Sequence, residues 1–174
     1  LTDSQATPGA LAEFKRTRFN IWSRAANALL RQDDWARCAD KYLTRDEYLG
    51  KPGFAGADLA SRNDLAATCL LFEDGPTIAA FWRYYICEGA PVFEQSPELA
   101  TLYLSWSDAG WLRITPGAYI DFNLIRDDLI ADLERHGITR VGVDDWQANQ
   151  FIADLQAEGY EPVAVKKTAR NITE

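Results

Sequence analysis

The chain is organised around residues 54–64, which read Phe54-Ala55-Gly56-Ala57-Asp58-Leu59-Ala60-Ser61-Arg62-Asn63-Asp64. A short apolar run after Pro-Gly that ends before Asn-Asp predicts a core strand over 54–59 and then a polar turn. The strand brings the carboxylate of Asp58 to its end, where an ionised Asp is costly to bury unless it is paired, hydrogen-bonded or metal-bound. Asp58 could equally cap a nearby turn, so both interpretations stand.

A second stretch, residues 139–146, repeats this arrangement, because the apolar strand predicted over 139–144 ends in Asp144 and Asp145. Mg²⁺ and Mn²⁺ prefer carboxylate oxygens, and two such ions can activate water and stabilise the leaving oxygen in phosphodiester hydrolysis. We therefore predict that Asp58 and Asp144 are catalytic ligands of a two-metal site for Mg²⁺ or Mn²⁺. Asp145 is a rival metal ligand, although its place before the helix predicted over 147–158 favours an N-cap.

Composition narrows the class of protein. The 174 residues are 47% hydrophobic, which is enough for one well-packed domain. No apolar run is long enough to cross a membrane. The three cysteines are far apart and offer neither a zinc motif nor a disulfide framework, and Cys69 is predicted to be a core thiol. The one histidine, His136, excludes a His-rich metal site and indicates a helix C-terminus before Gly137.

The net charge of −8 argues against a nucleic-acid-binding protein, because phosphate neutralisation needs Lys and Arg. The carboxylates of a metal site would contribute to that negative charge. Basic residues also gather locally near the end of the chain. From charge alone, Lys166, Lys167 and Arg170 are predicted to contact DNA.

The order of elements predicts an α/β fold. Strands over 54–59, 65–72 and 77–86 are joined by short connections and form an antiparallel meander. Helices and strands then alternate, as parallel crossovers require, with helices starting at Pro97, after Asp121 and at Gln147, and strands over 139–144 and 162–165. This order resembles that of the ribonuclease H-like fold, which implies that the strand over 139–144 lies beside the first strand. The tryptophans and tyrosines at 81–85, 103, 106 and 111 are predicted to be core residues, with base stacking as the alternative.

Several short motifs follow one another in an informative order: Gly56 to Leu65; Tyr103, Trp106 and Gly110; Thr115-Pro116-Gly117 with Ile120-Asp121; and Asp144, Trp146, Ala148 and Gln150. With these residues the chain resembles the nuclease domain of the large terminase subunit of tailed bacteriophages, in particular the HK97-like group. The resemblance implies a ribonuclease H-like mixed sheet whose C-terminal helix is missing. Residues 1–40 would be a linker or helical remnant of a preceding ATPase motor domain, and residues 41–174 a nuclease domain truncated at its C-terminus.

The resemblance also implies an activity. Such a domain is a metal-dependent endonuclease that cuts concatemeric viral double-stranded DNA during packaging, with the small terminase subunit and the portal protein as partners, in the cytoplasm of the bacterial host. Asp58 matches the first acidic motif and Asp144 the second, although Asp144-Asp145-Trp146 stands where the family usually has Asp-Pro-Trp. The alternatives are another ribonuclease H-like nuclease, such as a junction resolvase, and a docking module of the motor that does not cut.

Overall fold

A computed structural model describes residues 32–144 and 148–166, and the chain divides into two units, Leu1–Thr44 and Arg45–Glu174. In the first unit the structure describes one helix, α2 (Gln32–Arg37). Residues 1–31, most of the segment expected to be a linker or helical remnant of a motor domain, lie outside the described residues. The domain boundary expected near residue 40 stays a prediction.

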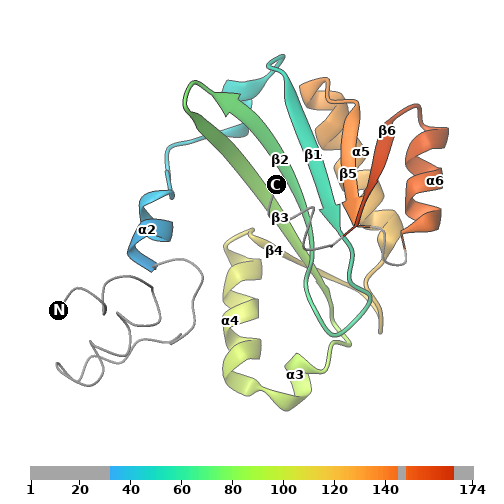
Figure 1. The fold of residues 1–174 in the computed structure, drawn as a ribbon. Helices are drawn as coiled ribbons and strands as arrows, with labels where there is room; N and C mark the ends of the chain where they lie inside the picture. Colours follow the sequence, from blue (N-terminus) through green and yellow to red (C-terminus); the bar gives the residue numbers. More distant parts are fainter. Residues whose placement is uncertain (1–31, 145–147, 167–174) are drawn as a thin grey trace, which may run out of the picture. The chain divides into compact units, whose positions relative to one another are not determined.

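The second unit is built on a six-stranded mixed sheet (Figure 1). Its strands are β1 (Gly53–Asp58), β2 (Ala66–Asp74), β3 (Thr77–Cys87), β4 (Leu112–Thr115), β5 (Arg140–Asp144) and β6 (Glu161–Val165), in the order β4-β3-β2-β1-β5-β6. The pairs β1–β2 and β2–β3 are antiparallel, and the pairs β3–β4, β1–β5 and β5–β6 are parallel. This confirms the predicted meander followed by parallel crossovers.

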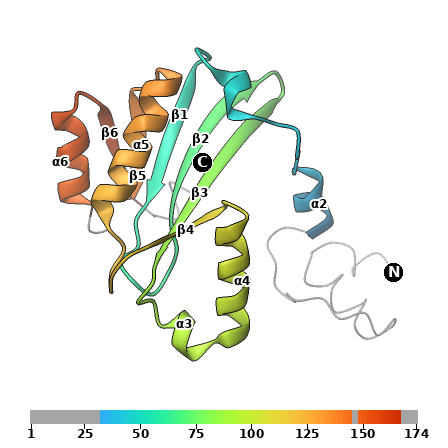
Figure 2. The ribbon, with the colours of Figure 1, turned by 180° about the vertical axis from the view of Figure 1, so that it is seen from behind.

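The helical elements of this unit are η2 (Arg45–Tyr48), α3 (Val92–Gln95), α4 (Pro97–Asp108), α5 (Phe122–His136) and α6 (Asn149–Ala157). Figure 2 shows α5 in front of the sheet, where it connects β4 to β5. Its limits follow from local chemistry: Asp121 Oδ1 accepts a hydrogen bond from the Asn123 N–H (2.9 Å), and Gly137 ends the helix at φ 68°. Both ends agree with the prediction.

The core lies between α5 and the sheet. Strands β1 and β5 bury alternate residues, and α5 buries Ile125, Leu129 and Leu133. His136 ends the same helix as predicted and is also buried, with its ring 5.3 Å from that of Phe72. Neither of its ring nitrogens has a hydrogen-bond partner among the described residues.

Helix α4 begins at Pro97 as predicted, whereas the start of α6 differs from the prediction. Ser96 precedes α4 but makes no capping hydrogen bond through its side chain, because its backbone at φ −139° and ψ 78° is outside the usual cap geometry. Helix α6 begins at Asn149 with Ala148 in the N-cap position, two residues later than expected. Asp145, the predicted N-cap, lies outside the described residues.

Candidate metal centre

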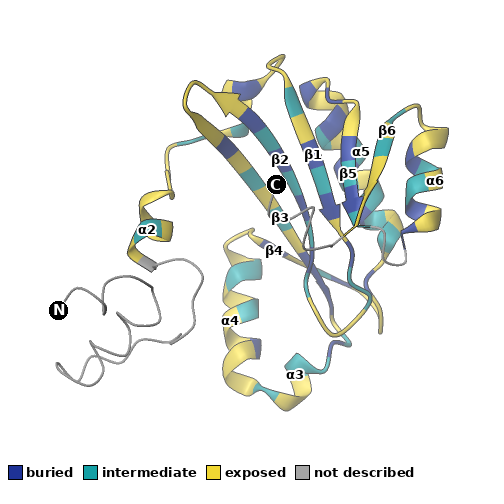
Figure 3. Ribbon diagram, in the orientation of Figure 1, coloured by how far each residue is buried: buried dark blue, intermediate teal, exposed yellow. Residues whose placement is uncertain are grey.

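One face of the sheet, which we call the open face, carries the predicted acids. Side chains alternate across each strand, so Ala55 and Ala57 are buried on the α5 side while Phe54 and Asp58 are exposed on the other side. The same alternation exposes Trp82 on β3. Figure 3 shows this mixture of buried and exposed positions along the strands.

The strand register brings Asp58 and Asp144 together. Ala57 pairs with Val143 in the parallel β1–β5 ladder, and the two acids are the next residues on these strands. Neighbouring strands lie about 4.8 Å apart, so two carboxylates at the same end of adjacent strands are close enough to bind the same metal ion. The buried side chain of Leu59 anchors the chain just beyond Asp58, and the Ile120 N–H donates to the Ser61 carbonyl (2.8 Å).

A second row of residues crosses the open face next to the acids. Each of its members is the register partner of the next on the neighbouring strand. From β3 to β6 they are Trp82, Cys69, Gly56, Gly142 and Val163. The three central residues are small, whereas the two outer ones are large. We call this set the glycine row. It forms a low strip of surface beside the carboxylates.

Asp58 and Asp144 both line a pocket of about 300 Å³ over this strip, which we call the acid pocket. Cys69, Trp82 and Val165 also line it. The prediction that Cys69 is a core thiol is therefore wrong in part: the residue is half-buried and faces the pocket, because it lies on the open side of β2. Burial raises the pKa of this thiol, and a backbone hydrogen bond at Gly56 opposes the shift. The thiol is accordingly neutral near pH 7 and a poor nucleophile.

The remaining acids and basic residues singled out in the sequence do not line the acid pocket, or lie outside the described residues. Asp64 is exposed, and its Oδ1 accepts from the Leu65 N–H (2.8 Å), in agreement with a turn. Lys166 is exposed and follows Val165, a residue of the acid pocket. Lys167 and Arg170 lie outside the described residues, as does Asp145. Whether any of the basic residues contacts DNA stays a prediction.

The acid pocket fits a divalent cation in its donor chemistry. Two carboxylates on adjacent strand ends offer the oxygen ligands that Mg²⁺ and Mn²⁺ prefer, and water and a phosphate oxygen can complete the shell. Within residues 32–144 and 148–166, no group of three His, Cys, Asp or Glu side chains is arranged to hold a metal. The fit to a divalent cation therefore rests on Asp58 and Asp144 alone. Asp145, the predicted rival ligand, is the next residue in the sequence after Asp144.

The prediction of an aromatic core is wrong for three residues. Tyr85 is fully buried, but Trp82 is 47% exposed, Tyr84 37% and Trp111 66%. Strand alternation explains the difference, because Trp82 and Tyr84 belong to the open side of β3, where their rings stack 6.3 Å apart. Three arginines that no sequence pattern singles out also lie together at the sheet edge, Arg45, Arg83 and Arg113. They are far apart in the chain, and no local motif connects them.

Other residues of the ordered motifs support the fold. Tyr103 and Trp106 stack with ring centroids 5.4 Å apart on α4, and Gly110 ends that segment at φ 78°. Ala148 is fully buried before α6. In the described part of the chain, no helix combines the length and apolar character needed to cross a membrane.

Comparisons with known proteins agree with this arrangement. The family model described as "Terminase large subunit, endonuclease domain" matches residues 2–170. The chain is similar to protein YmfN of Escherichia coli K12 (26% identity over 169 residues, 92% of this chain and 37% of that protein). It is also similar to the large terminase subunit of Enterobacteria phage HK97 (23% identity over 146 residues, 84% of this chain and 28% of that protein). The chain thus spans little more than a third, at most, of the length of these relatives.

Comparison with a solved structure identifies the fold. The crystal structure of the HK97 bacteriophage large terminase superposes with a TM-score of 0.58 at 25% identity, over 76% of this chain and 30% of that one. The mixed sheet described above is accordingly ribonuclease H-like, as the sequence predicts.

Proposed function

Because this chain belongs to the family of terminase large-subunit endonuclease domains, we propose that it cuts concatemeric viral DNA during genome packaging with the help of Mg²⁺ or Mn²⁺. Its substrate is double-stranded DNA, and the protein that contains it works with a small terminase subunit and a portal protein in the cytoplasm of the bacterial host. It is of phage or prophage origin.

The observation that supports this proposal is the position of Asp58 and Asp144 at adjacent ends of β1 and β5, in one pocket. In the proposed site these two carboxylates hold the metal ions, with Asp145 as a further candidate ligand. Bound ions of this kind polarise the phosphodiester and make water a better nucleophile. The chain's own residues position the ions and the substrate: the glycine row leaves room for the DNA backbone, and the neutral Cys69 adds no competing negative charge.

Crystals soaked in Mn²⁺ give a direct test through the anomalous scattering of the ion. We expect a peak about 2.0–2.6 Å from carboxylate oxygens of both Asp58 and Asp144, the usual range for such hard cations. A peak elsewhere, with none between these two acids, would overturn the assignment of the site.

Cleavage of supercoiled plasmid in Mn²⁺ tests the activity itself. Asp58→Asn and Asp144→Asn should each lower the rate by at least about 100-fold, since each removes a charged ligand from the reacting centre. Asp64→Asn is the matched control, because that exposed acid serves a turn. Comparing Asp144→Asn with Asp145→Asn identifies which of the two acids is the ligand. Equal cleavage by Asp58→Asn and the unaltered chain would refute the proposal.

A further inference from the structure

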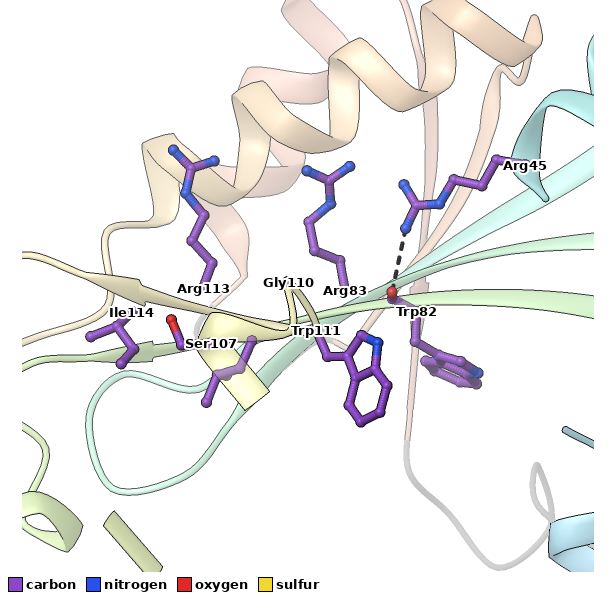
Figure 4. A pocket seen from close by; sticks show the side chains of 9 residues that line it. Arg45, Trp82, Arg83, Ser107, Gly110, Trp111, Arg113 and Ile114 are labelled. Carbon is purple, nitrogen blue, oxygen red and sulfur yellow. Dashed lines mark hydrogen bonds between the residues drawn. The ribbon is translucent and has the colours of Figure 1, made fainter. Parts of the chain in front are cut away.

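A second pocket, of about 530 Å³, lies at the edge of the sheet beside β3 and β4 (Figure 4). We call it the edge pocket. Arg45 from η2, Arg83 from β3 and Arg113 from β4 line it, together with Trp82 and Trp111. Figure 4 shows the three guanidinium groups in a row on one side of the strands and the two indoles on the other side, so the pocket bends around the sheet edge.

Two acids on α5 hold this row of arginines in place. Asp132 accepts hydrogen bonds from Arg45 Nη1 (3.1 and 3.2 Å) and from Arg83 Nη2 (2.9 and 3.1 Å). Asp128 accepts from Arg113 Nη1 (2.6 Å) and lies 3.6 Å from Arg83 Nη1. Three cations against two anions leave a local positive charge in a chain whose net charge is −8. The edge pocket is therefore a cationic site in an acidic protein.

The guanidinium groups keep donors for a further anion. Arg113 uses Nη1 for Asp128, and no described residue accepts from its Nη2 or Nε; its side chain is 48% exposed. A planar guanidinium that one carboxylate already orients can bind a second oxyanion at a low cost in side-chain entropy. A phosphodiester has the oxygen geometry and the charge that this arrangement recognises.

The edge pocket adjoins the acid pocket. Trp82 lines both pockets, and Arg113 lies on β4, three strands from β1, or about 14 Å across the sheet from the acids. Each strand of B-DNA carries one charge per 3.4 Å of helix axis, roughly, so a duplex with one phosphate at the acid pocket has others within this distance. Trp111, 66% exposed, presents an indole of the kind that packs against sugars and bases.

We propose that the edge pocket binds the phosphodiester backbone of the DNA that extends from the acid pocket, with Arg113 as the principal phosphate contact and Trp111 as an apolar contact beside it. This proposal rests on the proposed function, since it assigns the surface that holds the same substrate. The ion pairs to Asp128 and Asp132 also attach α5 to the sheet. A purely structural role for them predicts altered stability and an unaltered response of DNA binding to salt.

Fluorescence anisotropy of a labelled duplex of about 20 bp in EDTA measures binding without cleavage. Arg113→Gln should bind about three- to tenfold more weakly, and the slope of log K against log salt should fall in magnitude by about one. Arg135→Gln is the matched control, because it removes the same charge from an exposed ion pair with Asp46 at the C-terminal end of α5, and Arg135 does not line the edge pocket. Trp111→Ala should weaken binding with an unchanged salt slope, whereas Trp35→Ala, equally exposed, should not.

Two outcomes would overturn the proposal: an unchanged salt slope in Arg113→Gln, or an equal loss of affinity in Arg135→Gln. Arg113→Lys covers the case in which the Gln variant does not fold: it keeps the charge and should keep the slope, but it should bind more weakly because the planar guanidinium is lost. Unaltered affinity in Arg113→Lys would then overturn the proposal. The assay is also independent of the proposed cutting. Asp58→Asn should bind the duplex at least as tightly as the unaltered chain, so a chain that binds through Arg113 without cutting would refute the nuclease activity alone.

Discussion

Gly56 on β1 pairs with Gly142 on β5, two residues before Asp58 and Asp144 on the same strands. A Cβ atom at Gly142 would lie 3.4 Å from Val165 Cγ2, and one at Gly56 would lie 3.0 Å from Cys69 Sγ. The space beside the two acids therefore depends on the absence of side chains at this pair.

Gly142→Ala tests the use of this space. The methyl group meets only ordinary contacts, with Val165 and with the Ala55 carbonyl oxygen, so we expect the free energy of unfolding to stay within about 1 kcal/mol of the unaltered value. We expect plasmid cleavage to slow about tenfold or more, since a small displacement of a substrate from its reacting geometry is costly. Ala80→Val, on the same face of β3 and outside the acid pocket, is the control for added volume. Unaltered cleavage in Gly142→Ala would show that the substrate does not use the glycine row.

Asp132→Asn tests the attachment of α5 to the sheet edge. This side chain is 13% exposed and accepts from both Arg45 and Arg83, so loss of its charge leaves two arginines poorly paired. We expect urea unfolding to report a loss of about 1–3 kcal/mol. Asp46→Asn breaks the exposed pair with Arg135 and should change stability by less than about 0.5 kcal/mol. Equal effects of the two substitutions would contradict the difference in burial.

Tyr85 makes stability depend on alkaline pH. Its burial, and then the charge of Asp128, raise the pKa of its hydroxyl, which donates to Asp128 (3.1 Å). Above about pH 10 an unfolded tyrosine loses its proton while the folded Tyr85 keeps it, so the unfolded state binds fewer protons and stability falls as pH rises.

Tyr85→Phe should therefore cost about 1 kcal/mol near pH 7, where the hydrogen bond is lost, and should make stability fall less steeply above about pH 10. Urea unfolding over this pH range measures both effects. The exposed Tyr119 provides the control, and Tyr119→Phe should follow the unaltered chain. If the stability of Tyr85→Phe fell as steeply above about pH 10 as that of the unaltered chain, groups other than Tyr85 would cause the pH dependence.

His136→Leu removes two buried nitrogen atoms that have no hydrogen-bond partner among the described residues. Because an unsatisfied buried polar group is costly, we expect this variant to be as stable as the unaltered chain or more stable. Leu133→Ala, also fully buried on α5, should lose about 2–5 kcal/mol in the same assay. A loss of more than about 2 kcal/mol in His136→Leu would mean that the imidazole has a stabilising partner.

Much of the fold could be predicted because its signals are local. The apolar runs that end at Asp58 and Asp144 correspond to β1 and β5, and Asp121 and Gly137 mark the two ends of α5. Short connections identify the antiparallel strands, and helices between strands identify parallel crossovers. The adjacency of β1 and β5 is expected because the order of the elements resembles that of the ribonuclease H-like fold.

The exposure of side chains could not be predicted in the same way. Alternation shows that Trp82 and Tyr84 share a face, but it does not show which face α5 covers. The core position predicted for Cys69 is wrong in part for the same reason, because the open face of the sheet cannot be identified from alternation. The edge pocket depends on register and on the spacing of Asp128 and Asp132 by one helical turn, and these relationships exist only once the elements are packed.

The parallel pairing of β1 with β5 also sets an order of events. β1 leaves the ribosome before β2, β3, β4 and α5, and β5 is made only after all of these. Long-range pairs of this kind form late, because the intervening chain must close first. A nascent chain therefore holds Asp58 without Asp144, and the pair exists only after α5 has crossed to β5. A chain at this stage of synthesis therefore lacks the complete acid pocket on which the proposed cutting depends.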